Sequence, residues 1–254
     1  MADTTCPVCN SVAQLLDVVD FNKSCEEARG KFLPLTGRSI YYASCASCGF
    51  VFAPEMHQWS AQEFAQHVYN DAYIDVDPDY AEARPAANAA ALADMFKGKS
   101  NGIRHLDFGA GQGLLSAKLA AKGWNSSAYD PFVNTTTALS SLGKFHLITA
   151  YEVFEHSPDV QKLMKDIKSL LADDGIVLFS TLLSDQQITP NARLNWWYAA
   201  PRNGHISLFN GQSLHLLALQ HGLQLGSFSA GFHVLFTKPP SWALHLFDAP
   251  EAMA

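Results

Sequence analysis

The chain has 254 residues, 48% of them hydrophobic, and its 24 acidic and 17 basic side chains give a net charge of −7. This apolar content supports a buried core and excludes a wholly disordered chain, while the acidic balance argues against general attraction to nucleic-acid phosphates. The sequence holds no run of the ~20 apolar residues that a membrane span needs. Its start lacks the basic and apolar regions of a secretion signal, so we expect a cytoplasmic protein without membrane contact.

Four of the five cysteines form two Cys-x-x-Cys pairs, Cys6 with Cys9 and Cys45 with Cys48. In a reducing compartment two such pairs favour one tetrahedral zinc ion, because each short turn presents two thiolates. Four thiolates leave no ligand position for water, so we expect the zinc to be structural. A redox pair or two unrelated turns are the alternatives, and Cys25 is expected to be an ordinary free thiol.

The chain divides into four segments by composition. Residues 1–55 hold the cysteines and short β segments and are predicted to be a zinc-binding module. Residues 56–98 read as a helical lid or linker that is rich in alanine and interrupted by aromatic and acidic residues. Two glycines at 98 and 102 mark a break, after which residues 99–240 form the main domain and residues 241–254 a C-terminal tail.

Strands and helices alternate along the main domain. The apolar patterns predict strands at 103–108, 126–129, 145–150 and 176–180, helices at 114–122, 157–171 and 213–220, and a closing hairpin of 223–229 with 232–237. Ser157 and Pro158 look like the N-cap and first residue of the middle helix. The fold class is therefore α/β: a doubly wound, mostly parallel, Rossmann-like sheet with a C-terminal antiparallel hairpin, preceded by a small zinc-ribbon-like module.

A glycine-rich loop follows the first strand, in the sequence Leu-Asp-Phe-Gly-Ala-Gly-Gln-Gly over residues 106–113. Its alternate glycines allow a sharp turn and close approach of a ligand, and open α/β sheets bind ligands at this edge. Asp107 before the loop suits a cationic amino group rather than a pyrophosphate. Asp130, at the end of the second strand, can accept hydrogen bonds from two ribose hydroxyls. A ligand with a ribose, no phosphate and an amino-acid tail is S-adenosylmethionine (SAM).

Residues 103–237 resemble the class I, Rossmann-like SAM-dependent methyltransferases. The matching segments are DFGAGQG, YDP, AYEVFEHSP and LADDGIVLFST. The nearest groups are the ubiquinone-pathway O-methyltransferases and the sugar and natural-product methyltransferases, several of which are also similar over the cysteine module and the tyrosine-rich segment. The resemblance implies that SAM contacts Asp107, Gly109, Ala110, Gly111, Gly113, Asp130, Pro131, Tyr151 and Tyr73. Another Rossmann-like nucleotide binder is the alternative.

One segment departs from the family pattern. Only 14 residues separate Asp130 from the strand at Phe145, which is too few for the usual helix and third strand. The acidic residue that relatives often place beside the adenine amino group has no counterpart here. We therefore expect Pro131, Phe132 and backbone groups to form a shortened adenine wall.

Candidate catalytic residues follow the later strands. His205 and His156 are the candidate bases for deprotonating an acceptor hydroxyl, and Glu152 would line the methyl-donor side. Glu152, Glu155, His156 and His205 also resemble the magnesium-binding quartet of small-RNA 2′-O-methyltransferases, which implies a second site for Mg²⁺ or another divalent cation. The alternative is that Glu155 and His156 only cap a helix and that His205 only orients its loop.

The expected activity is methyl transfer from SAM to a small molecule, a sugar or secondary metabolite, most readily at oxygen. Aromatic residues around positions 69–80 and 196–198 suit the wall of such a pocket, although core packing also accounts for aromatic clusters. Arg84 and Arg202 could pair with an anionic group of the acceptor or with protein carboxylates. An RNA methyltransferase and a non-catalytic SAM-binding scaffold are the alternatives; the charge of −7 argues against nucleic acid as a partner.

Overall fold

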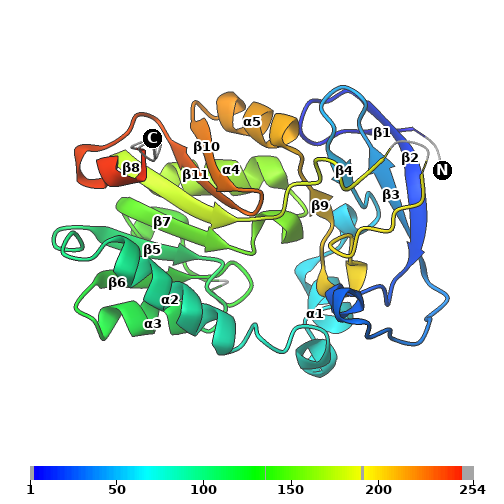
Figure 1. Cartoon of the computed structure of the whole chain (residues 1–254), viewed down its shortest axis with the longest axis horizontal. Helices are drawn as coiled ribbons and strands as arrows, with labels where there is room; N and C mark the ends of the chain where they lie inside the picture. The colour runs from blue at the N-terminus through cyan, green and yellow to red at the C-terminus, as the bar shows by residue number, and fades with distance from the viewer. Residues whose placement is uncertain (1–2, 135, 190–191, 248–254) are drawn as a thin grey trace, which may run out of the picture.

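Two β-sheets organise the computed structural model, which describes residues 3–134, 136–189 and 192–247 (Figure 1). The larger sheet has six strands in the order β10-β11-β8-β7-β5-β6. Their bounds are β5 Arg104–Phe108, β6 Asn125–Tyr129, β7 Phe145–Tyr151, β8 Leu171–Ser180, β10 Gln224–Ser229 and β11 Phe232–Phe236. Strands β6, β5, β7 and β8 are parallel, and β11 and β10 close the sheet as an antiparallel hairpin. The predicted fold class is confirmed.

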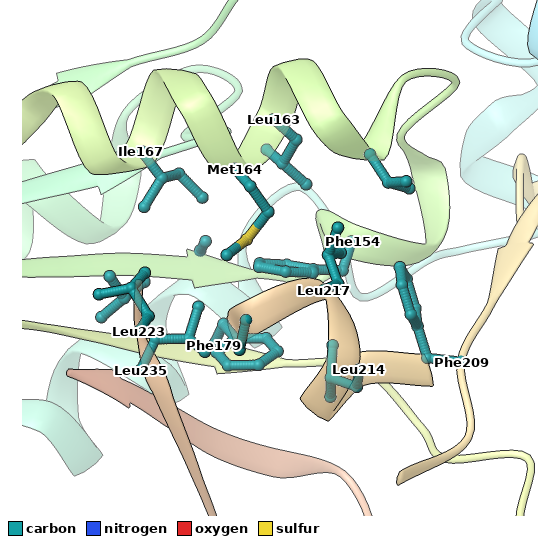
Figure 2. Close-up of a cluster of buried hydrophobic side chains, with 14 of the residues drawn as sticks. Phe154, Leu163, Met164, Ile167, Phe179, Phe209, Leu214, Leu217, Leu223 and Leu235 are labelled. Carbon is teal, nitrogen blue, oxygen red and sulfur yellow. The ribbon is translucent and has the colours of Figure 1, made fainter. Parts of the chain in front are cut away.

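Helices cover both faces of this sheet because its central strands are apolar on both sides. In β7 and β8, residues Ile148 and Phe179 belong to a core shared with α4 (Val160–Leu170) and α5 (Gly211–Gln220). Figure 2 shows Phe179 in this core with Met164 of α4 and Leu217 of α5. In the same two strands, the neighbouring residues Leu147 and Leu178 belong to the opposite core, under α2 (Ala83–Met95) and α3 (Leu114–Ala120). Continuous apolar strands of this kind are typical of parallel sheets.

Helix α4 begins later than the sequence pattern suggests. Its N-cap is Asp159, whose side chain accepts a hydrogen bond from the backbone N–H of Lys162, so the assignment of Ser157 as N-cap and Pro158 as first helical residue is wrong. Ser157 instead follows the short 3₁₀ helix η5 (Phe154–His156), and its carbonyl accepts a hydrogen bond from Ser207 Oγ. Ser157, which the local pattern predicts to be the N-cap, thus makes a tertiary contact with Ser207 instead.

The second half of the usual nucleotide-binding unit is short, as the spacing indicates. Between β6 and β7 the described residues contain only a 3₁₀ helix, η4 (Leu139–Ser141), and no third strand. Strand β6 is consequently the edge of the sheet on this side. The loop after Asp130 therefore borders the ligand edge of the sheet directly.

The N-terminal sheet incorporates a strand from the main domain. Its order is β1-β2-β3-β4-β9, with β1 Thr4–Thr5, β2 Val12–Asp20, β3 Ser39–Ser44, β4 Val51–Phe52 and β9 Ser207–Leu208. Strands β2 and β3 form a long hairpin, and the insertion between them carries the 3₁₀ helix η1 (Cys25–Arg29). Pairing of β4 with β9 places this sheet beside the ligand edge of the larger one (Figure 1).

The segment between the two sheets is helical. It contains η2 (Met56–Gln58), α1 (Ala61–His67), η3 (Asp71–Asp75) and then α2. At the other end of the chain, the 3₁₀ helix η7 (Ser241–Leu246) buries Ala243 in the core to which α2 and α3 also contribute, while residues 248–254 of the predicted tail lie outside the described residues. No helix in the described ranges has both the length and the apolarity to cross a membrane.

Candidate active site

The two cysteine pairs meet at one point of the N-terminal sheet. Cys6 Sγ lies 3.6 Å from Cys48 Sγ, Cys9 Sγ lies 3.4 Å from Cys45 Sγ, and all four sulfur atoms are within 4.8 Å of one another. Four thiolates at ~2.3 Å from a tetrahedral zinc ion are ~3.8 Å apart, so the observed cluster fits such an ion. The four sulfurs fill a tetrahedral coordination sphere, which fits a structural site.

Similar backbone turns shape the two pairs. Asn10 N donates to Cys6 O over 2.9 Å, and Gly49 N donates to Cys45 O over 2.7 Å. Both turn residues have positive φ, 62° for Asn10 and 77° for Gly49. A Cβ on Gly49 would lie 2.1 Å from Asn210 Nδ2, so glycine is required where the second pair packs against the N-cap of α5.

The cysteine cluster docks on the larger domain through glutamine side chains. Gln220 Nε2 donates to Val8 O over 2.8 Å and Gln161 Nε2 donates to Pro7 O over 3.1 Å. Cys6, Val8 and Cys48 are also part of the core formed with α4 and α5. The cysteine module is thus fixed to the helices that cover one face of the main sheet.

The glycine loop joins β5 to α3 and is held by the end of β6. Gly109 N and Ala110 N both donate to Tyr129 O, over 2.8 and 3.2 Å. Gly109 has φ of 76°, and a Cβ there would lie 2.5 Å from Val153 Cγ2. Gly113 is the N-cap of α3 with φ of 78°. The loop therefore needs glycine both for its backbone conformation and for its contact with the segment after β7.

Asp130 is tied to the same loop. Its Oδ2 accepts from Gly111 N over 2.9 Å and its Oδ1 accepts from Phe132 N over 2.8 Å. Each carboxylate oxygen has two lone pairs, so both can also accept a hydroxyl of a ligand. Pro131, the next residue, is exposed at the edge of the sheet.

Asp107 lies beneath the loop and is only 5% exposed. Its Oδ1 accepts a 2.8 Å hydrogen bond from Thr149 Oγ1. Burial raises the pKa of Asp107 to about 7, against the lowering effect of the Thr149 hydroxyl. A cationic partner would favour the carboxylate form, which makes Asp107 a fit neighbour for an ammonium group.

Aromatic side chains of the 56–98 segment pack over the end of β6. Tyr69 lies 6.0 Å from Phe132, 5.2 Å from Tyr73 and 6.2 Å from His156, measured between ring centroids. Tyr73 is 6% exposed, contacts Tyr80 and donates its hydroxyl hydrogen to Asn203 O at 3.5 Å. This segment bridges the adenine wall expected from Phe132 and the histidine side of the site.

Glu152 stands between two cavities at the end of β7. It is a non-glycine residue with φ of 54°, a strained conformation that often marks functional sites. Its Oε1 accepts from Ser180 Oγ over 2.7 Å. One cavity of about 300 Å³ is lined by Tyr151, Ser180 and residues of α2; the other, of about 340 Å³, is lined by both candidate histidines, and Glu152 borders both.

His156 and His205 come together because η5 runs beside residues 204–207. Ile206 N donates to Glu155 O over 2.9 Å, and the two imidazole centroids are 4.8 Å apart. His156 Nδ1 donates to Gly204 O over 3.1 Å and His205 Nδ1 to Tyr198 O over 2.8 Å. A carbonyl only accepts, so both histidines carry hydrogen on Nδ1 and present a bare Nε2. Burial lowers the pKa of both imidazoles and keeps them neutral.

Glu155 completes this group as a buried carboxyl group. It is 0% exposed, and neither of its oxygens has a hydrogen-bond partner among the residues that the structure describes. Ligand atoms of Glu155, His156 and His205 lie within 4.8 Å of one another, while the Glu152 carboxylate is outside this group and bonded to Ser180. Burial and the nearby Glu152 charge raise the pKa of Glu155 well above its usual range, so the group is a neutral acid unless a cation lies beside it. Two imidazoles with anchored Nδ1–H are typical of metal ligands, so this donor set fits a cation.

The two arginines have protein partners. Arg84 forms a two-pronged ion pair with Asp77, with N···O distances of 2.9 and 2.6 Å. Arg202 is 6% exposed and donates to Val68 O and Asn70 Oδ1. Arg202 therefore ties the 56–98 segment to the loop that carries His205, and Arg84 remains at the border of both cavities.

Sequence reasoning missed the contribution of the β2–β3 insertion. Cys25 and Arg29 line the 340 Å³ cavity, with Cys25 Sγ 3.7 Å from His205 Nδ1. Burial raises the pKa of the Cys25 thiol, so it stays protonated. Thirty-five residues separate Cys9 from Cys45, which leaves room for an insertion, but no residue pattern within that segment indicates that it reaches the cavity.

Comparison with known proteins agrees with this architecture. A family model described as "Methyltransferase domain" matches residues 80–227, more than half of the chain. Two ubiquinone biosynthesis O-methyltransferases of Actinobacillus pleuropneumoniae, from serotype 7 and serotype 5b, are 30% and 28% identical, each match covering 35% of this chain and 51% of the relative. The chain thus spans about half the length of these curated relatives.

Solved structures also match at low identity. An O-methyltransferase family protein from Burkholderia thailandensis is 13% identical with a TM-score of 0.44, covering 74% of this chain and 71% of that one. Magnesium protoporphyrin IX methyltransferase from Synechocystis PCC 6803, with S-adenosylhomocysteine (SAH) bound, is 15% identical with a TM-score of 0.39, covering 60% and 80%. Given the family match, together with the sheet order and the glycine loop, the chain belongs to the methyltransferase-domain family of class I, SAM-dependent enzymes.

Proposed function

We propose that this protein transfers the methyl group of SAM to an oxygen atom of a small molecule, a sugar or secondary metabolite. The observation that carries the proposal is the position of His156 and His205, both neutral, on a 340 Å³ cavity that Glu152 borders. This volume lies in the range of small-molecule sites, ~300–1,000 Å³. The curated relatives, which are named as O-methyltransferases, also support oxygen as the acceptor atom.

The cofactor would lie across the glycine loop. Asp130 would accept the ribose hydroxyls, and Asp107 would face the amino group of the methionine end. Gly109, Ala110, Gly111 and Gly113 would let the ligand approach the backbone, with Pro131 near the adenine and Tyr73 in the segment above it. Tyr151 and Glu152, at the end of β7, would border the methyl group, which moves to the acceptor by in-line displacement when the two are aligned.

Two modes of deprotonating the acceptor hydroxyl fit the same residues. In the first, the bare Nε2 of His205 or of His156 accepts the proton as a general base. In the second, Glu155, His156 and His205 would hold a divalent cation, whose charge would lower the pKa of the acceptor hydroxyl. The position of Glu155 beside both imidazoles supports the second mode, because a cation there would offset the burial that otherwise raises the pKa of Glu155 well above its usual range. A donor set with two imidazoles suits Mn²⁺, Co²⁺ or Zn²⁺ better than Mg²⁺.

The test is turnover of methyl-labelled SAM with a panel of hydroxylated small molecules. With His205 as the base, or as a ligand of the cation, His205→Gln is expected to lower turnover by at least ~100-fold, within the usual contribution of acid–base catalysis, while SAH binding measured by calorimetry stays unchanged. His215→Gln, at an exposed position on α5, is the matched control. Turnover by the His205→Gln protein at the wild-type rate would refute the proposed role.

Metal removal separates the two modes. Dialysis against EDTA abolishes turnover if the cation mode operates, and added Mn²⁺ or Co²⁺ restores it. Turnover that survives dialysis and does not rise with either ion leaves the general-base mode. EDTA also binds zinc, so the zinc content of the dialysed protein must be shown to be unchanged in this arm, since we also propose that Cys6, Cys9, Cys45 and Cys48 hold a structural zinc ion.

A further inference from the structure

A chain of hydrogen bonds crosses the interior of the large sheet and ends on Asp107. Ser116 Oγ lies 2.8 Å from Ser126 Oγ, which lies 2.7 Å from His105 Nδ1. His105 Nε2 lies 3.0 Å from Thr149 Oγ1, and Thr149 Oγ1 donates to Asp107 Oδ1 over 2.8 Å. The chain links α3, β6, β5 and β7 in a single network.

The direction of each bond follows from the chemistry of the groups. Burial lowers the pKa of His105 to about 3, so its ring is neutral with one N–H. The Thr149 hydrogen goes to Asp107, which leaves the Thr149 oxygen to accept from His105 Nε2–H. His105 Nδ1 then accepts from Ser126, and Ser126 accepts from Ser116. Because Thr149 Oγ1 accepts the His105 N–H, the hydroxyl hydrogen of Thr149 points toward Asp107.

Fold stability alone does not call for this network. His105 and Thr149 are both 0% exposed, and their strand neighbours on the same sheet face include apolar residues such as Leu147. A buried polar chain costs free energy unless every member is paired, whereas apolar side chains of similar volume would pack without that requirement. This hydrogen-bond network has two ends, Ser116 and Asp107, and Asp107 is the end that lies at the ligand edge of the sheet.

We propose that Thr149, oriented by His105, is a positioning residue that holds the Asp107 carboxylate in place for the ammonium group of the cofactor. Thr149 occupies Oδ1, so Oδ2 is the oxygen presented to a ligand. The inference rests on the proposed function, in which Asp107 faces the methionine end of SAM. It adds to that function a hydrogen-bond relay through the sheet.

The charges around Asp107 make ligand binding through the relay depend on pH. Burial and the nearby Asp130 charge raise the pKa of Asp107, while the Thr149 hydroxyl lowers it, with a resulting value of about 7. Tyr151 also lies close enough for Asp107 to raise the pKa of its phenol, and it stays neutral. The affinity for a cationic ammonium should therefore rise from pH 6 to pH 8 as Asp107 ionises. Loss of the Thr149 hydroxyl moves this rise to higher pH.

The experiment measures the Kd of SAH and of 5′-methylthioadenosine, which lacks the amino-acid end, by calorimetry between pH 6 and pH 8. Thr149→Val keeps the side-chain shape and removes the hydroxyl; we expect about tenfold weaker SAH binding at pH 7, in keeping with the loss of one hydrogen bond to a charged group. Binding of 5′-methylthioadenosine should be unchanged. Thr149→Ser restores the hydroxyl and should bind SAH as the wild type does, and Thr149→Ala is the second hydroxyl-free variant should the valine protein not fold.

Asp107→Asn separates the inference from the proposed function. If Asp107→Asn weakens SAH binding but Thr149→Val and Thr149→Ala leave its Kd and pH profile as in the wild type, the relay is refuted and the role of Asp107 stands. If Asp107→Asn itself binds SAH as tightly as the wild type, the proposed role of Asp107 is wrong. A weakening of both ligands by Thr149→Val would indicate a general structural effect and would also overturn the relay.

Discussion

Replacing Asp130 with alanine is expected to raise the Kd for SAH by at least ~100-fold, which corresponds to two lost hydrogen bonds to a charged group at ~1.5 kcal/mol each. The carboxylate has two tasks in the structure. It would accept the ribose hydroxyls, and it already accepts the backbone N–H of Gly111, so it sets the shape of the glycine loop. Both tasks fail together in the alanine protein.

Calorimetry with SAH measures this effect, and Asp173→Ala, an exposed acid in β8, is the control. The loss should extend to 5′-methylthioadenosine, because that ligand keeps the ribose; this distinguishes Asp130 from Asp107, whose loss affects the amino-acid end only. An Asp130→Ala protein with wild-type affinity for both ligands would contradict the ribose role.

Replacing Cys6 with serine is expected to remove the bound zinc and to destabilise the whole chain. Structural zinc contributes ~10–16 kcal/mol of apparent binding free energy in small zinc modules, and here the module shares a core with α4 and α5. Strand β4 of the same sheet pairs with β9, and Tyr42 Oη donates to His205 O over 2.7 Å. Loss of the module should therefore lower the Tm and also disturb the position of His205.

Zinc content after dialysis, measured by atomic emission, and thermal unfolding provide the readouts. Cys25→Ser is the matched control, because Cys25 lies outside the four-sulfur cluster, and its zinc content should equal that of the wild type. A Cys6→Ser protein that keeps both its zinc and its Tm would show that the cysteine pairs do not form a zinc site.

The local patterns were sufficient to predict the main sheet. Strands that are apolar at every position alternate with amphipathic helices, a pattern that predicts a parallel α/β sheet. The glycine loop after the first strand marks the ligand edge of that sheet. The gap of 14 residues after Asp130 also indicated the missing third strand. The sulfur atoms of the two cysteine pairs lie close together in the structure, as the sequence predicts.

Contacts between segments that are distant in the chain could not be predicted from the sequence. Pairing of Val51 with Leu208 joins strands more than 150 positions apart, and no local signal marks two residues in a loop as a strand. The start of α4 was misplaced because Ser207 competes for Ser157. The relay from His105 to Asp107 depends on the register of β5 against β7, which pairs Asp107 with Thr149, and register is set by the assembled sheet.

The second metal group illustrates the same limit. Glu152, Glu155, His156 and His205 were grouped as a second metal site because they resemble the magnesium-binding quartet of small-RNA 2′-O-methyltransferases. The structure brings Glu155, His156 and His205 within 4.8 Å of one another and directs Glu152 to Ser180. The positive φ of Glu152 turns its side chain away from the direction that a continued strand would give it, a feature that follows from the tertiary fold rather than from the motif.

A crystal structure of the protein with SAH bound would test the central claim most directly. We expect the ligand to lie over residues 109–113, with both ribose hydroxyls on the Asp130 carboxylate, its amino group toward Asp107 and its sulfur facing the cavity that His205 lines. Electron density for SAH elsewhere on the chain, or an empty crevice at saturating ligand concentration, would contradict the account.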